Sequence, residues 1–397
     1  YGIKSKKGVS KSKTYEKYKR LIGNGINEVF AQFFMRVYEL IPNGNLATFG
    51  TLKYVSSQNF IKLRNHFKAK FKKGFVCKAN TFDNVRGNFP ISFLIWDMEN
   101  KQQISEIEVD VYSNDKEIKQ LSFSGTKKIF AVEKGKLIID WLRKYFDKTD
   151  RRIGYLRIQG TDVQQNNTIF ITNQPSESDF RESKVTDITK NNLIECSIYF
   201  SVRKVIPATW LNDRDQFLFP NKQWEDDIEF QNDCLTYTLF NNNISSKNGV
   251  NHWIPFPETE INARDKFDSH FMISFLSGKI VKNAYVDLFC QLEIENKKES
   301  KTGWKQGQKR AFSPEAQAVF DAGKDLWKYY HAQPKCNVNA GLYDIREHFK
   351  GRNNKGKMNQ KSDNETYNEL IDNLHSVLKI LAKKIEPKVY EYDFLKK

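Results

Sequence analysis

The sequence lacks the cysteine spacings that build disulfide or metal scaffolds. Its five Cys in 397 residues stand apart from one another, and no Cys-x-x-Cys pair occurs. A disulfide scaffold is therefore excluded, and we expect no structural zinc or other metal site. The chain also has no run of about 18 uncharged apolar residues and no visible signal peptide, so we expect no transmembrane helix and a cytoplasmic location.

The usual signatures of small-molecule enzymes are missing as well. There is no Walker sequence, no Gly-x-Gly-x-x-Gly and no Gly-x-Ser-x-Gly, and only six His are present. Phosphate loops and serine-hydrolase chemistry therefore have no support. The histidine in Asn251-His252-Trp253 is read as a core or turn residue.

Charge is what the sequence has in excess. The formal net charge is +16, and residues 1–100 hold eighteen Lys or Arg against six Asp or Glu. Such a field concentrates polyanions near one region of a protein, so nucleic acid is the favoured partner. A solubility surface is the alternative, and an acidic membrane is disfavoured because the basic stretch contains no clean amphipathic helix. Residues 1–20, rich in Lys, Ser and Gly, predict a loop.

Helix and strand patterns alternate between residues 26 and 98, which indicates a layered α/β sheet whose last two strands form a hairpin. The strand Phe89–Met98 is apolar on both faces and should be internal. The expected elements are a helix over 26–41 ended by Pro42-Asn43-Gly44, a strand over 45–51, a helix over 59–71, and strands over 74–77 and 89–98.

Beyond residue 100 the pattern is irregular. We expect strands over 104–112, 152–158, 168–172 and 195–202, a helix near 136–145, and a basic linker over 296–311. Ser313-Pro314-Glu315 predicts a helix start, with Ser as the N-cap and Pro at the first helical position. A last helix should begin near Asp363 and end at Pro387.

Two acidic groups raise the alternative of a metal-dependent nuclease, which needs convergent carboxylates. One group falls in a short window and comprises Asp213, Asp215, Glu225, Asp226, Asp227, Glu229 and Asp233. The other is Asp179 with Glu182 and Lys184. A solvated acidic surface is the more economical interpretation of both.

Aromatic side chains beside basic residues are compatible with base flipping, because an extruded base needs a ring to stack on and cations for its phosphates. Tyr1 opens the basic stretch, and Phe82 lies in a polar loop before an apolar strand. Simple packing under that loop is the competing interpretation of Phe82.

The chain resembles adenine-specific DNA methyltransferases. The resemblance begins at Tyr1-Gly2 and KSKKGVSKSKTYEKYKRLIGNGINEVFAQFFMRVYEL, and NTFDNVRGNFPISFLIW resembles the loop and strand closing the methyltransferase sheet. ATWLNDRDQFLFP, EFQNDCLTYTLF, NHWIPF, YDIREHFKGRN and EPKVYEYDF resemble later regions of bacterial type II, including type IIG, restriction–modification proteins. The resemblance covers most of the chain.

The resemblance implies a mechanism. In this family an Asn-Pro-Pro-Tyr (or Phe) motif accepts hydrogen bonds from the adenine amine, which then attacks the methyl group of S-adenosylmethionine. Only the aromatic position is present here, as Tyr1; the Asn, both Pro and the cofactor-binding half are not. The resemblance thus implies that the chain alone is inactive. It assigns base stacking to Tyr1 and Phe82, with Phe89 as the competitor of Phe82, and no cofactor-binding residue.

Residues 101–310 are expected to form a target recognition domain. Side chains that read bases or bind phosphates are normally Arg, Lys, Asn or Gln. Candidates there include Arg203, Lys204, Asn212, Arg214 and Asn251, although 210–215 is equally a self-satisfied polar turn. The favoured phosphate contacts are Lys4, Lys6, Lys7, Lys11 and Lys13, and the favoured further DNA contacts are Arg203 and Arg214.

Together these features predict an α/β protein: the C-terminal half of a Rossmann-like methyltransferase sheet (1–100), an irregular α/β recognition domain (101–310) and a small helical C-terminal region (311–397). The expected parent is a site-specific DNA (adenine-N6) methyltransferase using S-adenosylmethionine, whose partners are double-stranded DNA and a missing N-terminal half or nuclease domain. A metal-dependent nuclease and a non-catalytic DNA-specificity subunit remain the alternatives.

Overall fold

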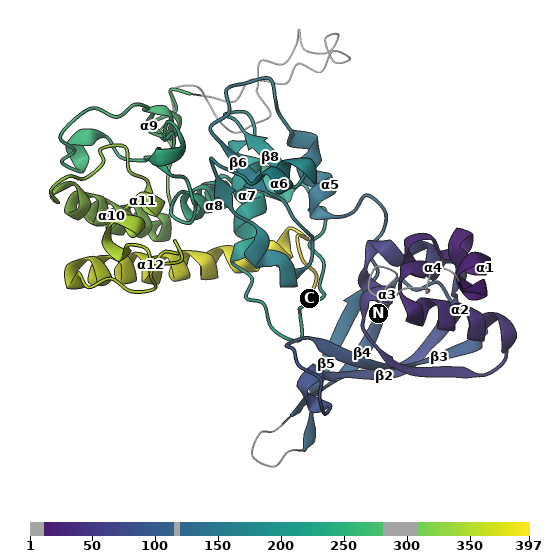
Figure 1. Cartoon of the computed structure of the whole chain (residues 1–397). Coiled ribbons are helices and arrows are strands. Elements are labelled where there is room, and N and C mark those ends of the chain that lie inside the picture. Colours follow the sequence, from purple (N-terminus) through teal and green to yellow (C-terminus); the bar gives the residue numbers. More distant parts are fainter. Residues whose placement is uncertain (1–11, 115–119, 281–308) are drawn as a thin grey trace, which may run out of the picture.

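The computed structural model describes residues 12–114, 120–280 and 309–397, and these residues form two hydrophobic cores. One core draws its buried side chains from Tyr18 to Ile129, and the other from Ile138 to Leu395. Figure 1 shows the two units side by side, joined through residues 131–137. We call them the N-terminal and C-terminal units.

The N-terminal unit is an open, mixed five-stranded sheet with helices on one face (Figure 1). The strand order is β1-β3-β2-β4-β5; all neighbours are antiparallel except the parallel pair β2 and β4. Its elements are α1 (Lys13–Ile22), α2 (Val29–Leu40), β1 (Asn45–Gly50), α3 (Lys53–Ser56), α4 (Ile61–His66), β2 (Ala69–Lys78), β3 (Pro90–Lys101), β4 (Glu106–Asn114) and β5 (Leu121–Phe130).

Several expectations for this unit are confirmed. The protein is α/β, β2 and β3 pair as the predicted hairpin, and β3 is internal, with β1 on one side and β2 on the other. Alternate residues of β3 are buried on the helical face, where Trp96 donates a hydrogen bond to the Tyr54 hydroxyl over 2.9 Å. The sheet also continues past residue 100, so residues 106–130 share its core.

Two local predictions in this unit are wrong. Residues 13–22 form a helix rather than a loop, because Ser12 caps the helix through the Tyr15 amide and the i, i+4 pair Tyr18 and Ile22 is buried. The helix expected over 59–71 ends at His66. The remainder enters β2, where Phe71 pairs across the strands with Trp96 and so gains more burial than in a helical turn.

The C-terminal unit is built around buried helices, with a small antiparallel sheet of order β7-β6-β8. Its elements are α5 (Ile138–Leu142), β6 (Gly154–Arg157), β7 (Ile171–Thr172), α6 (Glu177–Arg181), β8 (Val185–Ile188), α7 (Leu193–Lys204), α8 (Ile228–Leu239), α9 (Phe271–Leu276), α10 (Pro314–His331), α11 (Leu342–Lys350) and α12 (Glu365–Glu391). The Ser313 side chain caps α10 as predicted.

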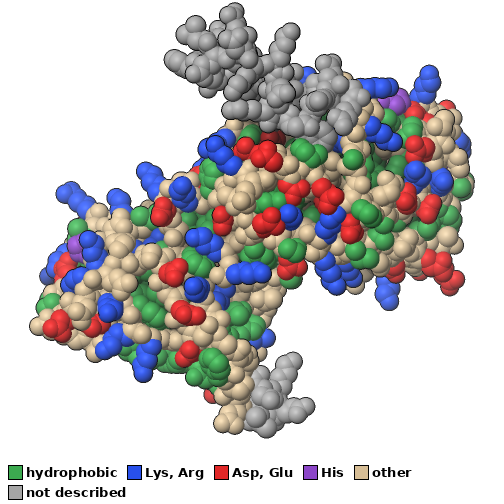
Figure 2. Space-filling model, turned by 180° about the vertical axis from the view of Figure 1, so that it is seen from behind, with side chains coloured by type: hydrophobic (Ala, Val, Ile, Leu, Met, Phe, Trp, Pro, Cys, Tyr) green, Lys and Arg blue, Asp and Glu red, His purple; other side chains and the backbone are tan. Residues whose placement is uncertain are grey.

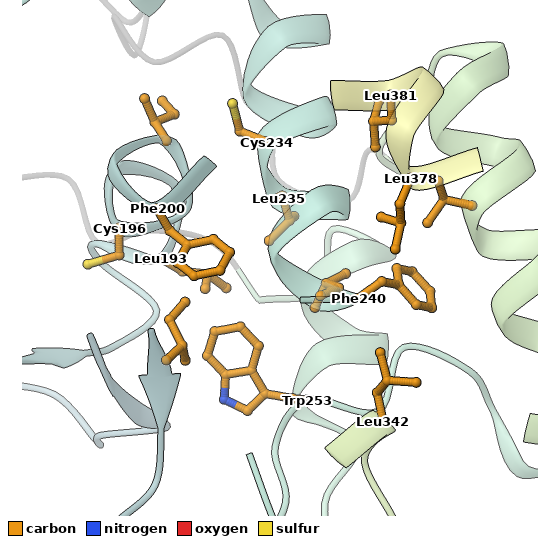
Figure 3. Close-up of a cluster of buried hydrophobic side chains, with 14 of the residues drawn as sticks. Leu193, Cys196, Phe200, Cys234, Leu235, Phe240, Trp253, Leu342, Leu378 and Leu381 are labelled. Carbon is orange, nitrogen blue, oxygen red and sulfur yellow. The ribbon is translucent and has the colours of Figure 1, made fainter. Parts of the chain in front are cut away.

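One core unites this unit. Figure 3 shows side chains of α7, α8 and α12 meeting at Phe200, Leu235 and Leu378, with Trp253 and Leu342 below them. The helices after residue 311 therefore share their core with residues 138–276 rather than forming a separate hydrophobic cluster.

Two further predictions in the C-terminal unit are wrong. The segment 195–202 is part of helix α7 and not a strand, since a segment that is apolar on every side does not reveal its period. Pro387 lies inside α12, which continues to Glu391 because Ile385 and Val389 pack into the core on either side of it. Tertiary burial there outweighs the lost backbone hydrogen bond.

A buried histidine in this unit predicts a pH-dependent stability. His331, the last residue of α10, is buried, and its Nε2 has no hydrogen-bond partner among the described residues. Burial and then the charge of Arg264 lower its pKa from 6.5 to about 4. Between these two pKa values, His331 binds a proton in the unfolded chain but not in the folded protein. The contribution of neutral His331 to the free energy of unfolding is therefore present above pH 6.5 and is lost as the pH falls toward 4.

Replacing His331 with Gln removes the group that takes up this proton in the unfolded chain. We expect the free energy of unfolding of the wild type to fall by on the order of 3 kcal/mol more than that of His331→Gln between pH 6.5 and 4. Urea denaturation at several pH values measures the difference. If the free energies of unfolding of the two proteins changed in parallel with pH, the pKa of His331 would not be lowered in the folded protein.

Candidate nucleic-acid interface

The face of the five-stranded sheet opposite the helices carries six aromatic side chains, which we call the aromatic row. Phe49, Phe93 and Phe75 are paired across β1, β3 and β2. The row continues through Tyr112 on β4 to Phe123 on β5, with successive ring centroids separated by 4.7, 5.7, 5.6 and 6.1 Å. Phe49 and Phe123 are more than half exposed. Large exposed apolar patches of this kind usually mark interaction sites.

The sixth ring, Phe82, belongs to the loop between β2 and β3. Its centroid lies 5.5 Å from that of Phe49, edge to face, so the loop places it at the β1 end of the row. The amide of Phe82 donates to the Ala79 carbonyl and its carbonyl accepts from Val85. Phe82 and Phe89 are both partly exposed, and the Phe89 ring lies so close to Gly87 that a Cβ there would be 2.4 Å from it.

Exposed charged side chains of both signs accompany the aromatic row. Arg86, in the loop of Phe82, and Lys73, paired with Ile95 on the open face, are both exposed. Asp110 on β4, whose side chain is exposed, is the register partner of Phe75 on β2. Arg86 and Lys73 attract phosphates, whereas Asp110 and the exposed Asp83, which is next to Phe82 in the same loop, repel them. Figure 2 shows Lys and Arg side chains spread over this unit among hydrophobic ones.

The basic N-terminal residues are only partly described. Tyr1, Lys4, Lys6, Lys7 and Lys11 lie outside the described residues, so the structure does not place them beside Phe82. Lys13 is exposed as the first residue of α1 and is accessible to a phosphate.

The structure excludes Arg203 as a DNA contact. It is fully buried on α7, where its guanidinium donates to the Asn166 side chain, the carbonyls of Gly160 and Asp162, and the Tyr199 hydroxyl over 2.8–3.2 Å. Burial lowers its pKa. A guanidinium committed to internal acceptors cannot reach a base edge.

Arg214 belongs to a polar turn that satisfies itself. Its guanidinium contacts Gln164 at 2.6 Å and Asp213 at 3.1 Å, and Asn212 accepts from the Thr209 amide and donates to the Pro207 carbonyl. These contacts are those expected of a polar turn over 210–215, and the Arg214 side chain is partly exposed. Beside it, Asp215 and Lys127 form a 2.7 Å ion pair between the two units.

Two other side chains singled out in the sequence are internal. Asn251 is buried, donates to the Asn339 carbonyl and accepts from the Trp253 amide. His252 contacts the Ser269 hydroxyl through Nδ1 over 2.6 Å, and burial lowers its pKa. The interpretation of His252 as a satisfied core or turn histidine is confirmed.

The acidic groups do not converge as a nuclease would need. Within the described part of the chain, no three His, Cys, Asp or Glu side chains are gathered as around a metal ion. Asp215 pairs with Lys127, Asp227 with Lys388, Glu229 and Asp233 with Lys384, and Asp179 with Arg157. These carboxylates serve ion pairs, so the geometry gives the nuclease alternative no support.

Sequence reasoning identified Phe82 but missed the rest of the aromatic row. Phe49, Phe75, Phe93, Tyr112 and Phe123 come from five strands that are separated along the chain. The expected strands contained Phe49, Phe75, Phe93 and Tyr112, and no strand was expected around Phe123. Strand register decides whether such residues share a face.

No helix among the described residues is both long and apolar enough to cross a membrane. No family model, no curated protein and no solved structure matches the chain.

Proposed function

We propose that this chain is the DNA-binding and target-base-binding part of a site-specific DNA (adenine-N6) methyltransferase from a restriction–modification system. The observation that carries the proposal is the partly exposed ring of Phe82, which lies against Phe49 at the β1 end of the aromatic row. A flipped adenine needs an accessible aromatic face with cations nearby. The loop that holds the partly exposed Phe82 also carries the exposed cation Arg86.

The edge of the sheet also supports this proposal. Among the described residues β1 pairs only with β3, so its other edge is open. The neighbouring helix α2 and the residue after it expose Phe33, Leu40 and Ile41. An open strand edge is suited to a sheet that continues into further strands, and exposed apolar side chains are suited to further packing, as expected if a cofactor-binding half pairs there.

The described residues do not fit S-adenosylmethionine by themselves. In the family that the sequence resembles, acidic and glycine residues of the other half hold the cofactor. β1 ends here at Gly50, and Thr51 leads into the buried Leu52 and Tyr54. We therefore assign no cofactor contact to this chain. Its contribution is to bind the duplex and to receive the adenine.

A duplex with one unpaired adenine tests the proposal, because such a base costs little to extrude. We expect this duplex to bind the chain more tightly than the fully paired duplex. Phe82→Ala should weaken binding of the unpaired-adenine duplex by roughly 5- to 150-fold, the value of one base–aromatic stack of about 1–3 kcal/mol. Fluorescence anisotropy of labelled duplexes measures both affinities.

Phe123→Ala is the matched control, because Phe123 is an exposed phenylalanine on the same face beyond Asp110. It should retain the preference for the unpaired adenine. Equal losses in both variants, or no preference in the wild type, would reject base stacking at Phe82.

A further inference from the structure

The C-terminal unit contains a pocket distinct from the aromatic row. Its volume is about 250 Å³, and it opens between the end of α7, the segment before β7 and the segment after α8. The lining residues are Asn167, Ile169, Phe170, Phe200, Lys204, Asn241 and Asn243. Drug-sized ligands occupy larger cavities, of roughly 300–1,000 Å³, so this pocket suits a smaller ligand.

Three asparagine side chains supply polar groups to the pocket, and Asn167 among them is exposed. Within the described residues, the side chains of Asn167 and Asn243 have no hydrogen-bond partner, and Asn241 uses only its Nδ2, which donates to the Tyr237 carbonyl over 2.9 Å. An amide both donates and accepts, which is the pattern that a nucleobase edge presents. Ile169 and Phe200 are buried behind these amides and supply an apolar wall.

Lys204 supplies the charge. It is the last residue of α7 and only partly exposed, and its Nζ lies 5.9 Å from the centroid of the Phe200 ring. Burial and the adjacent charge of Arg203 lower its pKa to about 8. No carboxylate among the described residues pairs with it, unlike Lys384 and Lys388 in the same unit. A partly desolvated ammonium without a counter-ion is a ready site for an anion.

We propose that this pocket binds one nucleotide, with the phosphate at Lys204 and the base edge at the amides of Asn167 and Asn243. The nucleotide comes either from DNA or from the free mononucleotide pool, since both present the same phosphate and base. The inference does not depend on the methyltransferase proposal, whose test uses Phe82 in the other unit.

Isothermal titration of the full chain with dAMP tests this site. We expect saturable binding of dAMP, weaker binding of deoxyadenosine, and a loss of about tenfold or more in dAMP affinity for Lys204→Met, the value of a charge-assisted hydrogen bond. Deoxyadenosine binding should be unchanged by Lys204→Met. Lys204→Arg keeps the charge and should retain most of the dAMP affinity.

Two further variants separate binding from folding. Lys328→Met removes an exposed lysine on α10 of the same unit and should bind dAMP as the wild type does. Asn243→Leu should lower the affinities for dAMP and deoxyadenosine alike, and thermal unfolding checks that each variant is folded. If Lys204→Met is unfolded, Asn243→Leu and Lys204→Arg still decide the outcome.

A duplex competitor identifies the source of the nucleotide. Displacement of dAMP by the duplex assigns the pocket to DNA, and failure to displace it assigns the pocket to free mononucleotides; both support the site. The inference is overturned if dAMP does not bind, if inorganic phosphate binds as tightly as dAMP, or if the Lys204 and Asn243 variants bind as the wild type does.

Discussion

Arg203→Met is expected to lower the free energy of unfolding of the C-terminal unit by about 3–5 kcal/mol, the cost of breaking a buried polar network from one side. The substitution leaves the Asn166 side chain, two backbone carbonyls and the Tyr199 hydroxyl without their donor. Loss of the desolvated charge offsets part of this cost. Methionine fills much of the volume, so the effect reports on the hydrogen bonds rather than on a cavity.

Urea denaturation followed by tryptophan fluorescence measures this change, because Trp141, Trp224, Trp253 and Trp327 are all buried in the C-terminal core. Arg203→Lys keeps the charge but has fewer donors, so its loss should be intermediate. The folded Arg203→Met protein should bind DNA like the wild type. A variant that is as stable as the wild type but binds DNA more weakly would instead show that Arg203 contacts DNA.

Reversing three charges in the basic N-terminal segment should have the largest effect on DNA binding. If Lys4, Lys6 and Lys7 each neutralise one phosphate, replacing them with Glu removes about 2.7 from the slope of log K against log salt. At 0.1 M salt this corresponds to a loss of affinity of roughly 500-fold. Anisotropy titrations at several salt concentrations between about 50 and 300 mM give both the slope and the affinity.

The control is a second triple Lys→Glu variant, which changes the net charge by the same amount in the C-terminal unit. Lys328, Lys379 and Lys383 are exposed on α10 and α12, and their triple replacement by Glu should leave the slope close to that of the wild type. If both triple variants lose the same slope, DNA responds to the overall charge of +16 and not to the N-terminal segment.

Local sequence signals predicted the elements whose ends are chemically marked. Ser313-Pro314 begins α10, Pro42-Asn43-Gly44 follows α2, and β3 is internal as its apolar faces required. The failures occurred where long-range burial overrides local preference. α7 is buried on all sides, so its periodicity is hidden, and α12 continues through Pro387 because it packs on α10 and α8.

The candidate site was predictable only in part, for a related reason. Phe82 is marked by its polar loop, but its position beside Phe49 depends on how β1 and β3 pair. Arg203 illustrates the opposite error: an arginine in the expected recognition domain suggested a DNA contact, and the fold buries it against Asn166 and Tyr199. Residue type indicates what a side chain can bind, and packing decides what it reaches.

The most direct test of the methyltransferase proposal is the coding sequence immediately upstream of Tyr1. The proposal makes Tyr1 the aromatic position of the catalytic motif, so it predicts codons for Asn-Pro-Pro directly before this residue. A different tripeptide at that position, or a start codon directly before Tyr1, would contradict the account.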